Sequence, residues 1–436
     1  MNKSTFKTHP YAWCVLLLNS LFLFYKYVLQ ISPSVMTDSL MQKFHLTGAG
    51  LGNLAATYFY TFLFAQLLVG YLLDKYSPRW LTGLAILMCS LGTWFFAASN
   101  TLFEAELARG LMGVGVAFAT VSYMKQTSVW FPAKRLALVG GLLASAVGVG
   151  AVVGSAPVAY MVSNIGWKQT LHYVALAGFV LTALYVIFAR DKNPLNNSLN
   201  NKNKSPLSWK QVKAVLTKKH NWLLTFYSGL AFSPLAVFSG LWGNPFLQEA
   251  YNLNTTQAAG YITLSFVGLG LGAPIFGLLS DKLGHRVKVM SSGTLLSLLA
   301  LVMMVYGHTH SSLLLGTEMF LFGLGTGAFM LGFTLGKEWN SLAMTATVVA
   351  MINTGDALFG AFSEPFVGKL LDVFSFGSAN HGSHFALSDF HKAFLVLPVY
   401  LLLALVFAFY LNKVKNKNLQ EESNNKKQDK LKLAAA

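Results

Sequence analysis

Hydrophobic residues recur along almost the whole chain in runs long enough to cross a membrane. A helix needs about 20 predominantly apolar residues to span the hydrocarbon core, where unpaired backbone groups are too costly for an open structure. The runs predict twelve transmembrane helices, near residues 11–32, 50–73, 80–98, 102–126, 137–162, 170–189, 221–247, 255–279, 288–307, 312–336, 343–368 and 392–412. The expected fold class is therefore an all-α membrane protein.

A polar segment divides these runs into two sets of six. Residues 190–220 are rich in Asn, Ser, Lys and Pro, and they indicate a cytosolic linker. We call residues 1–189 the N-half and residues 221–412 the C-half, each with six predicted helices. Residues 413–436 form a polar, basic segment, which we expect to be a cytosolic tail without fixed structure.

Composition and charge narrow the class of protein further. Hydrophobic residues make up 54% of the chain and charged residues only 11%, which excludes an ordinary soluble globule. The net charge of +16 would suit nucleic acid, but Lys and Arg gather on one predicted side of the membrane and leave Lys43, Lys168 and Lys392 on the other. This bias predicts cytosolic termini, in the inner membrane if the protein is bacterial, and contact with membrane lipid rather than nucleic acid.

One polar motif occurs in both halves at a constant offset. Gly70-Tyr-Leu-Leu-Asp74-Lys75-Tyr-Ser-Pro-Arg79 follows the second run, and Gly277-Leu-Leu-Ser-Asp281-Lys282-Leu-Gly284-His-Arg286 follows the eighth. The first glycines lie 207 residues apart, and so do the aspartates. Such internal similarity predicts two six-helix pseudo-repeats.

These motifs resemble the loop signature of the major facilitator superfamily, Gly-x-x-x-Asp-Arg/Lys-x-Gly-Arg-Arg/Lys. The first copy departs from it where Ser77 replaces the second glycine and Pro78 precedes Arg79. In the fourth run, Arg109-Gly-Leu-Met-Gly113-Val-Gly115 is similar to the family's Arg-x-x-x-Gly-x-Gly pattern. The resemblance implies halves that rock about a central solute site. In the loop motifs, glycine would allow close helix approach, and aspartate would cap or pair near a helix end.

Polar residues inside predicted spans are the candidates for the solute or proton pathway, because each is costly in a membrane. In span one these are Lys26, which faces a cavity or snorkels to an interface, and Gln30 four residues further on. Span two offers Tyr58, which we prefer to Tyr60 as the inward residue. Arg109 in span four either acts in the solute or proton pathway or forms a structural ion pair with Glu104 or Glu106.

The C-half contributes a polar stripe in span eleven. Asn353, Asp356, Gly360 and Glu364 follow one another at intervals of three or four, which places them on one helical face. We expect Asp356 to carry a proton or to bind a solute ammonium group, with Glu364 as an outer-gate or structural group.

Near the outer end of span seven, Trp242 and Asn244 offer an aromatic wall and a hydrogen-bonding group. The alternative is an interfacial tryptophan beside a helix-ending Asn-Pro.

Signatures of catalysis and of cofactor or metal binding are missing from the sequence. There is no phosphate-binding Gly-Lys-Ser/Thr loop and no His-Glu-x-x-His. We therefore expect no enzyme activity and no cofactor, and we expect an ion or solute gradient to supply the energy for transport. His308, His310, His381, His384 and His391 are irregularly spaced; we expect exposed histidines that sense external acidity rather than a metal site.

The expected function is secondary active transport of a small polar solute by alternating access, with protons as the coupling ion and the monomer as the working unit. The stretch from Tyr25 to Ser34 resembles phagosomal transporters of intracellular bacteria, which implies uptake of amino acids or nucleosides. A cavity with both Lys26 or Arg109 and Asp356 would suit a zwitterion, so amino acids are the preferred class. The alternatives are a carboxylate siderophore or other organic anion, a nucleoside, export of a drug or metabolite, and a non-transporting sensor or scaffold.

Overall fold

The structure is a computed structural model that describes residues 9–131, 135–191, 209–307, 311–340, 344–375 and 385–414. The described residues fold into helices, and no strand occurs among them. Most of the predicted linker, the tail beyond residue 414 and four of the five candidate histidines (His308, His310, His381 and His384) lie outside the described residues.

The N-half contains seven helices and one short 3₁₀ segment among its described residues. In chain order they are α1 (Tyr11–Ile31), η1 (Ser32–Val35), α2 (Thr37–Phe44), α3 (Gly48–Lys75), α4 (Pro78–Ala98), α5 (Leu102–Trp130), α6 (Leu136–Ile165) and α7 (Trp167–Phe188).

The C-half begins after the short surface helix α8 (Trp209–Leu216). It comprises α9 (Lys219–Val237), the π-helical segment η3 (Phe238–Trp242), α10 (Gly243–Tyr251), α11 (Thr255–Leu283), α12 (Arg286–Tyr306), α13 (Ser312–Thr326), the 3₁₀ segment η4 (Gly327–Met330), α14 (Leu331–Glu338), α15 (Thr345–Ser375) and α16 (Leu387–Ala393), with a last helix over 396–414.

The helices agree with a polytopic membrane protein. In the described part of the chain, ten spans are long and apolar enough to cross a membrane. Four of them combine several elements: Tyr11–Val35, Lys219–Tyr251, Ser312–Glu338 and Leu387–Val414. Helices α3, with 28 residues, and α15, with 31, fall outside those ten but are also long enough to cross. Together they are consistent with the twelve predicted spans.

The two halves repeat one backbone plan in detail. Helix α1 is followed by η1 and the short helix α2, and α9 by η3 and the short helix α10. The helices α2 and α10 end at the two described non-glycine residues with positive φ, His45 at 51° and Asn252 at 52°, which lie 207 residues apart. The offset seen in the loop motif therefore extends over the first spans of each half, including their non-α-helical breaks.

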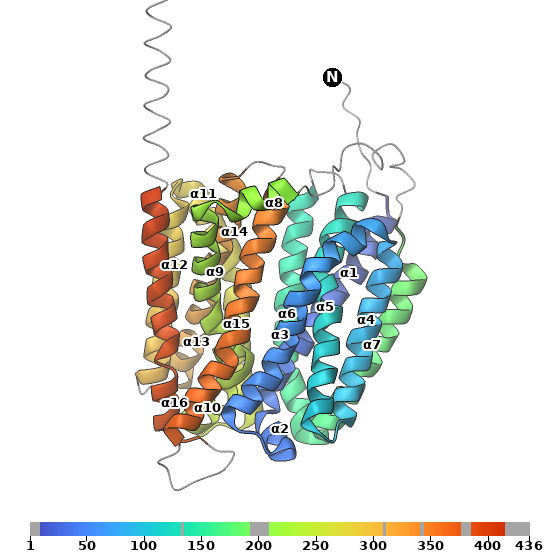
Figure 1. Cartoon of the computed structure of the whole chain (residues 1–436). Helices are drawn as coiled ribbons and strands as arrows, with labels where there is room; N and C mark the ends of the chain where they lie inside the picture. The colour runs from blue at the N-terminus through green and yellow to red at the C-terminus, as the bar shows by residue number, and fades with distance from the viewer. Residues whose placement is uncertain are drawn as a thin grey trace, which may run out of the picture.

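The halves lie side by side as two helical bundles (Figure 1). One end of the molecule carries α8, and the opposite end carries α2, α10 and α16. We call these the α8 end and the α2 end.

Glycines bring the helices around Arg109 into backbone contact. A Cβ on Gly113 of α5 would lie 2.3 Å from the carbonyl oxygen of Tyr58 on α3, and one on Gly115 would lie 2.5 Å from that of Ala85 on α4. Both distances are far below a normal contact, so these two glycines permit α5 to pack closely against α3 and α4. This packing fixes Arg109 and Tyr58 next to each other.

Candidate solute-binding site

Two basic side chains lie inside the N-half, on different helices. Lys26 of α1 is 7% exposed and Arg109 of α5 is 2% exposed. Tyr58 of α3 connects them: its hydroxyl donates to the carbonyl oxygen of Lys26 at 3.3 Å, and the Arg109 guanidinium lies 4.9 Å from its ring centre. The structure therefore brings together three of the predicted site residues.

Arg109 is held mainly by backbone carbonyl groups. Its Nη1 donates to Leu29 at 3.0 Å and its Nη2 to Ala55 at 3.3 Å, while its buried Nε has no partner. The predicted alternative of an ion pair with Glu104 or Glu106 is wrong for this structure. Both acids are engaged elsewhere, because Glu104 caps its own helix end and Glu106 accepts a hydrogen bond from Asn53.

Lys26 has a different environment from Arg109. Its amine lies 5.1 Å from the ring centres of both Tyr27 and Phe62. No described residue gives it a hydrogen bond or an ion pair. A mostly buried ammonium group without an anionic partner can bind the anionic group of a solute, and the two aromatic faces would limit its movement.

The C-half contributes two carboxyl groups from α15 to the same region. Asp356 is 7% exposed and Glu364 is 4% exposed, and one buried oxygen of each, Oδ1 and Oε2, lacks a hydrogen-bond partner. The hydroxyl of Ser228 on α9 faces the Asp356 carboxyl group and interacts with it. Unsatisfied buried groups of this kind are rare in folded proteins, so these are candidates for contact with a solute, water or proton.

Gly360 lies between the two carboxyl groups on the same face of α15. It is buried, yet a Cβ built on it would have no other atom within 4 Å. Empty space therefore borders the stripe where side chains of the two halves could otherwise meet. Asn353, at the start of the stripe, and Gln30 on α1 are half-buried.

Charges of opposite sign face each other between the halves. Glu364 interacts electrostatically with Arg109, and Asp356 with the hydroxyl of Tyr27, the neighbour of Lys26. Among the described residues, none of these acids forms an ion pair within 4.0 Å with Lys26 or Arg109. The N-half thus presents cations and the C-half presents acids to the same region, without a direct ion pair between these described residues.

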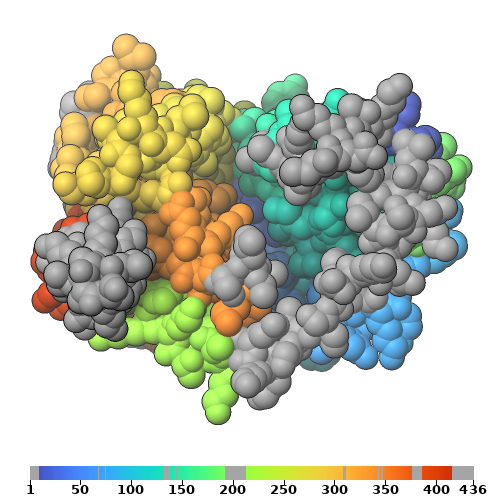
Figure 2. Space-filling view, turned by 90° about the horizontal axis from the view of Figure 1, so that it is seen from above, coloured from blue at the N-terminus to red at the C-terminus, as the bar shows by residue number. Residues whose placement is uncertain are grey.

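The α2 end is closed by contacts between the halves. Backbone N–H groups of Gly48 and Ala49 donate to Asp372 on α15, the Ser155 hydroxyl donates to the Ala259 carbonyl oxygen at 3.0 Å, and the hydroxyls of Ser163 and Thr256 lie 3.2 Å apart. These hydrogen bonds between the halves all lie toward this end. Seen from the α8 end, the surface is hollowed between the two halves (Figure 2).

Trp242 and Asn244 lie at the closed α2 end. The indole N–H of Trp242 donates to the Glu364 carbonyl oxygen at 3.0 Å. The amide of Asn244 donates to the Thr255 carbonyl oxygen at 3.1 Å and accepts from Gln248 at 2.7 Å. Trp242 also lines a cavity of about 170 Å³ with Thr37 and Asp38 of α2. Both residues thus take part in helix packing at the closed α2 end.

Comparison with known proteins identifies the family. The model of the Major Facilitator Superfamily matches residues 13–335 and 235–434. The chain belongs to the Major Facilitator Superfamily. The similar proteins found in the comparison are named as transporters. This protein is therefore a multi-pass membrane transporter and not an enzyme.

Relatives of this Major Facilitator Superfamily chain share modest sequence identity over most of its length. The uncharacterized transporter YybO of Bacillus subtilis (strain 168) is 22% identical and covers 92% of this chain and 94% of its own. The probable sulfoacetate transporter SauU of Cupriavidus necator is 21% identical, covering 80% and 85%. The probable galactarate/D-glucarate transporter GudP of Bacillus subtilis is 20% identical, covering 83% and 86%.

Solved structures of the superfamily share this fold. An inward-facing, unoccupied bacterial homologue of the human lysosomal transporter Spinster has a TM-score of 0.78 at 18% identity and covers 93% of this chain and 98% of its own. The nucleoside transporter NupG has a TM-score of 0.72 at 16% identity, covering 92% and 99%.

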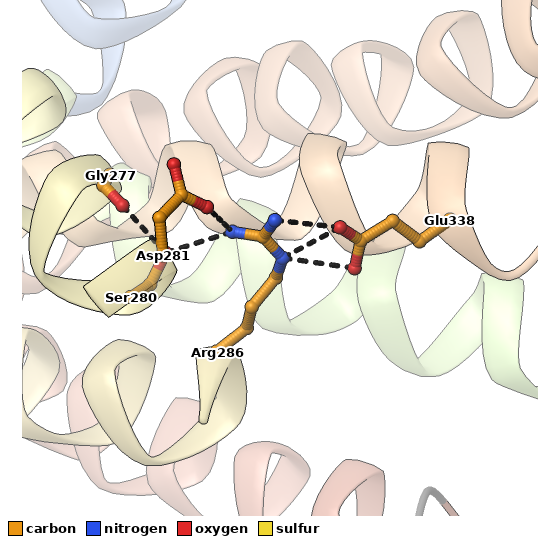
Figure 3. Close-up of polar contacts among 5 residues, drawn as sticks. All are labelled: Gly277, Ser280, Asp281, Arg286 and Glu338. Atoms are coloured by element: carbon orange, nitrogen blue, oxygen red, sulfur yellow. Dashed lines mark hydrogen bonds and ion pairs between the residues drawn. The ribbon is translucent and has the colours of Figure 1, made fainter. Parts of the chain in front are cut away.

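The second copy of the superfamily loop motif forms an ion-pair cluster at the α8 end. Arg286, at the start of α12, lies 2.8 Å from Asp281 of α11 and 2.7 Å from Glu338 of α14. It also donates to the hydroxyl of Ser280 (Figure 3). Gly284 has φ of +67° where α11 ends, a conformation that favours glycine. One arginine thus connects three helices of the C-half.

The first copy uses different partners. Arg79 donates through Nε to the Val186 carbonyl oxygen at 2.7 Å, and its backbone N–H donates to Asp191 at 2.7 Å. The hydroxyl of Ser77 also donates to Asp191. Ser77 caps α4, so the departure from the family pattern creates a helix start anchored to the end of α7. The side chain of Asp74 lies outside the described residues, and Lys75 lies near the rings of Tyr71 and Tyr76.

The expected packing role of the motif glycines is wrong for this structure. A Cβ on Gly70 or on Gly277 would have no other atom within 4 Å, so neither glycine is a point of close helix approach here. Lys282 is exposed beside Asp281. Of the predicted motif residues, Arg79, Asp281 and Arg286 form the hydrogen bonds and ion pairs described above, and Lys75 contacts aromatic rings.

Sequence reasoning missed three polar residues that the structure shows to be engaged at key contacts: Ser228, Asp191 and Asp372. Ser228 is one of several small polar residues within the predicted span 221–247, and Asp372 follows the predicted span 343–368, where it resembles a solvated loop residue. Asp191 follows the last run of the N-half and looks like part of the linker. Only the packing of α9 on α15, α4 on α7 and α3 on α15 reveals them.

Proposed function

We propose that this transporter moves a small organic anion with proton coupling, and that Lys26 binds the anionic group of the solute. The observation that carries the proposal is the buried Lys26 amine, which has no described partner and lies between two rings in the region where acids of the C-half face the N-half. Arg109 adds a second positive charge nearby while its carbonyl bonds keep it in place.

The names of the relatives support an anionic substrate. Sulfoacetate and galactarate or D-glucarate, in the names of SauU and GudP, are organic anions. Further relatives are named as transporters of L-galactonate in Escherichia coli (strain K12) and of ascorbate in Arabidopsis thaliana. The identities of 20–24% are too low to carry any one of these solutes over to this chain.

Amino acids remain the second candidate, because the same region contains acids of the C-half. The orphaned oxygens of Asp356 and Glu364 could accept a solute ammonium group while Lys26 binds its carboxylate. The resemblance of residues 25–34 to phagosomal transporters favours this reading. A solute that carries a carboxylate without an ammonium group would instead leave Asp356 free to carry a proton.

We further propose that the α8 end faces the cytosol, as the distribution of Lys and Arg predicts. The hollow at that end would then make this an inward-facing state. In a bacterium the protein would lie in the inner membrane, and one copy of the chain would suffice because each half completes the other.

Uptake into proteoliposomes tests the proposal. The panel contains sugar acids, sulfonates, amino acids and nucleosides, each with and without an inward proton gradient. We expect saturable accumulation of one anionic class that the gradient drives. Asp356→Asn should remove the response to the gradient while downhill flux continues, because the amide cannot carry the proton.

The outcomes separate the candidates. Accumulation of amino acids but not of hydroxy acids would replace the anion proposal with the zwitterion one. Gradient-driven uptake that is unchanged in Asp356→Asn would exclude Asp356 as the proton carrier. Flux of none of the solutes in either direction would favour a sensor or scaffold.

A further inference from the structure

The first turn of α3 is capped by a side chain from the opposite half. The backbone N–H of Gly48 donates to Oδ1 of Asp372 at 2.6 Å, and that of Ala49 donates to Oδ2 at 2.8 Å. Asp372 belongs to the last turns of α15. A carboxylate at a helix N-terminus meets unpaired N–H groups and the positive end of the helix dipole, so this contact is favourable.

We propose that Asp372 is a gating residue of the transport cycle: it latches the α2 end closed by capping α3, and its release is part of opening that end. This inference goes beyond the proposed substrate and coupling. It requires only that the halves separate at the α2 end during alternating access.

The equivalent helix of the C-half needs no such partner. Helix α11 begins with a complete local capping box, in which Asn254 accepts from the Gln257 N–H at 2.9 Å and Gln257 accepts from the Asn254 N–H at 3.0 Å. Helix α3 has Thr47 at the same repeat position, whose hydroxyl accepts from the Gly50 N–H at 3.2 Å. Its next residues are Gly-Ala-Gly, which offer no capping side chain, so the remaining N–H groups are satisfied from outside the helix.

The latch lies where the two halves touch through their backbones. A Cβ on Gly48 would lie 2.6 Å from the Gly368 carbonyl oxygen, and one on Gly52 would lie 2.6 Å from that of Glu364. The two hydrogen bonds of Asp372 exist because α3 and α15 are in direct contact here. If the two helices separate, Asp372 cannot keep both hydrogen bonds. Opening the α2 end must therefore return the carboxylate and the two N–H groups to water.

Reaction of a cysteine introduced at a buried position reports this opening. Ser34 in η1 is 0% exposed, its hydroxyl has no partner, and η1 contacts η3 of the opposite half. We would introduce Ser34→Cys into the full chain with Cys14→Ala and Cys89→Ala, reconstitute it in nanodiscs and measure the rate of reaction with a polar maleimide. Asp372→Asn should raise that rate about tenfold, because hydrogen bonds to an ionised group are worth more than neutral ones.

Asp191→Asn is the matched control. Asp191 also accepts a backbone N–H at a helix start, that of Arg79 at 2.7 Å, but donor and acceptor both belong to the N-half side of the molecule. Its loss should leave the rate of the maleimide reaction at position 34 unchanged. Asp372→Glu keeps the carboxylate and should give a rate between those of the parent and Asp372→Asn, which provides a second test if the asparagine variant is not monodisperse.

Equal reaction rates in the parent, Asp372→Asn and Asp372→Glu would overturn the proposal. So would an increase of the same size in Asp191→Asn, since the effect would then be a general loosening of the fold. Thermal unfolding of each variant separates the two, because only loosening lowers the midpoint in proportion to the reaction rate.

Discussion

The two halves share a backbone but differ in the charges that they place at their interface. The N-half contributes Lys26 and Arg109, and the C-half contributes Asp356 and Glu364. The residue 207 positions after Lys26 is Ser233, which is buried and donates to the Ser363 hydroxyl at 3.0 Å inside its own half. A repeated scaffold therefore holds an asymmetric pair of surfaces.

The same contrast holds for the other charged positions. When the glycine pairs of spans four and ten are aligned, Met319 takes the place of Arg109. When the prolines of α6 and α15 are aligned, Gly148 and Ala156 take the places of the two acids. Duplication provides the rigid bundles, and divergence at a few inward positions gives the site its two signs of charge.

The largest expected effect comes from removing the partnerless cation. Lys26→Ala should weaken solute binding by about 10–100-fold, because a charge-assisted hydrogen bond is lost in a poorly solvated site. Lys26→Arg should recover part of the affinity. Binding to purified protein by calorimetry measures this, with Lys168→Ala at the α2 end as the control. An unchanged Kd in Lys26→Ala would move the anion site to Arg109.

Filling the space between the halves should have the next largest effect. Gly360→Leu should lower the transport rate by about tenfold, since a side chain would occupy the space beside the acids and overpacking costs about 1–3 kcal/mol when the halves close. Gly270→Leu on α11 is the control, because its Cβ also has no neighbour within 4 Å. Initial uptake rates in proteoliposomes give the comparison. Equal losses in both variants would show that the effect is not specific to the α15 stripe.

The smallest effect should distinguish the two copies of the loop motif. A double-mutant cycle of Arg286→Ala and Glu338→Gln should give a coupling free energy of about 0.5–1 kcal/mol, because the pair is partly exposed and screened by solvent. The cycle of Arg79→Ala and Asp191→Asn should give less, since Arg79 meets Asp191 only through its backbone N–H. Thermal unfolding of the four variants in each cycle measures both values. A larger coupling in the first copy would contradict the assigned contacts.

Part of the candidate site could be predicted because charge in a membrane is conspicuous. Lys26, Arg109 and Asp356 stand out against apolar runs, and helical spacing indicated that Tyr58 and Tyr60 cannot both face inward. The partners of Arg109 could not be predicted, because Leu29 and Ala55 supply backbone carbonyl groups, which no sequence pattern marks. The same holds for Asp372, whose partners are the N–H groups of Gly48 and Ala49.

The sequence by itself determined the class of protein, the approximate positions of its membrane-spanning helices, and the duplication, because these depend on the length of apolar runs and on repeated local motifs. Only the tertiary structure decided which end is closed, where the acids of α15 lie relative to Lys26, and how the two loop motifs differ. Those features depend on contacts between residues far apart in the chain, some more than 300 positions apart, as for Gly48 and Asp372. Local patterns do not record which distant backbone atoms will meet.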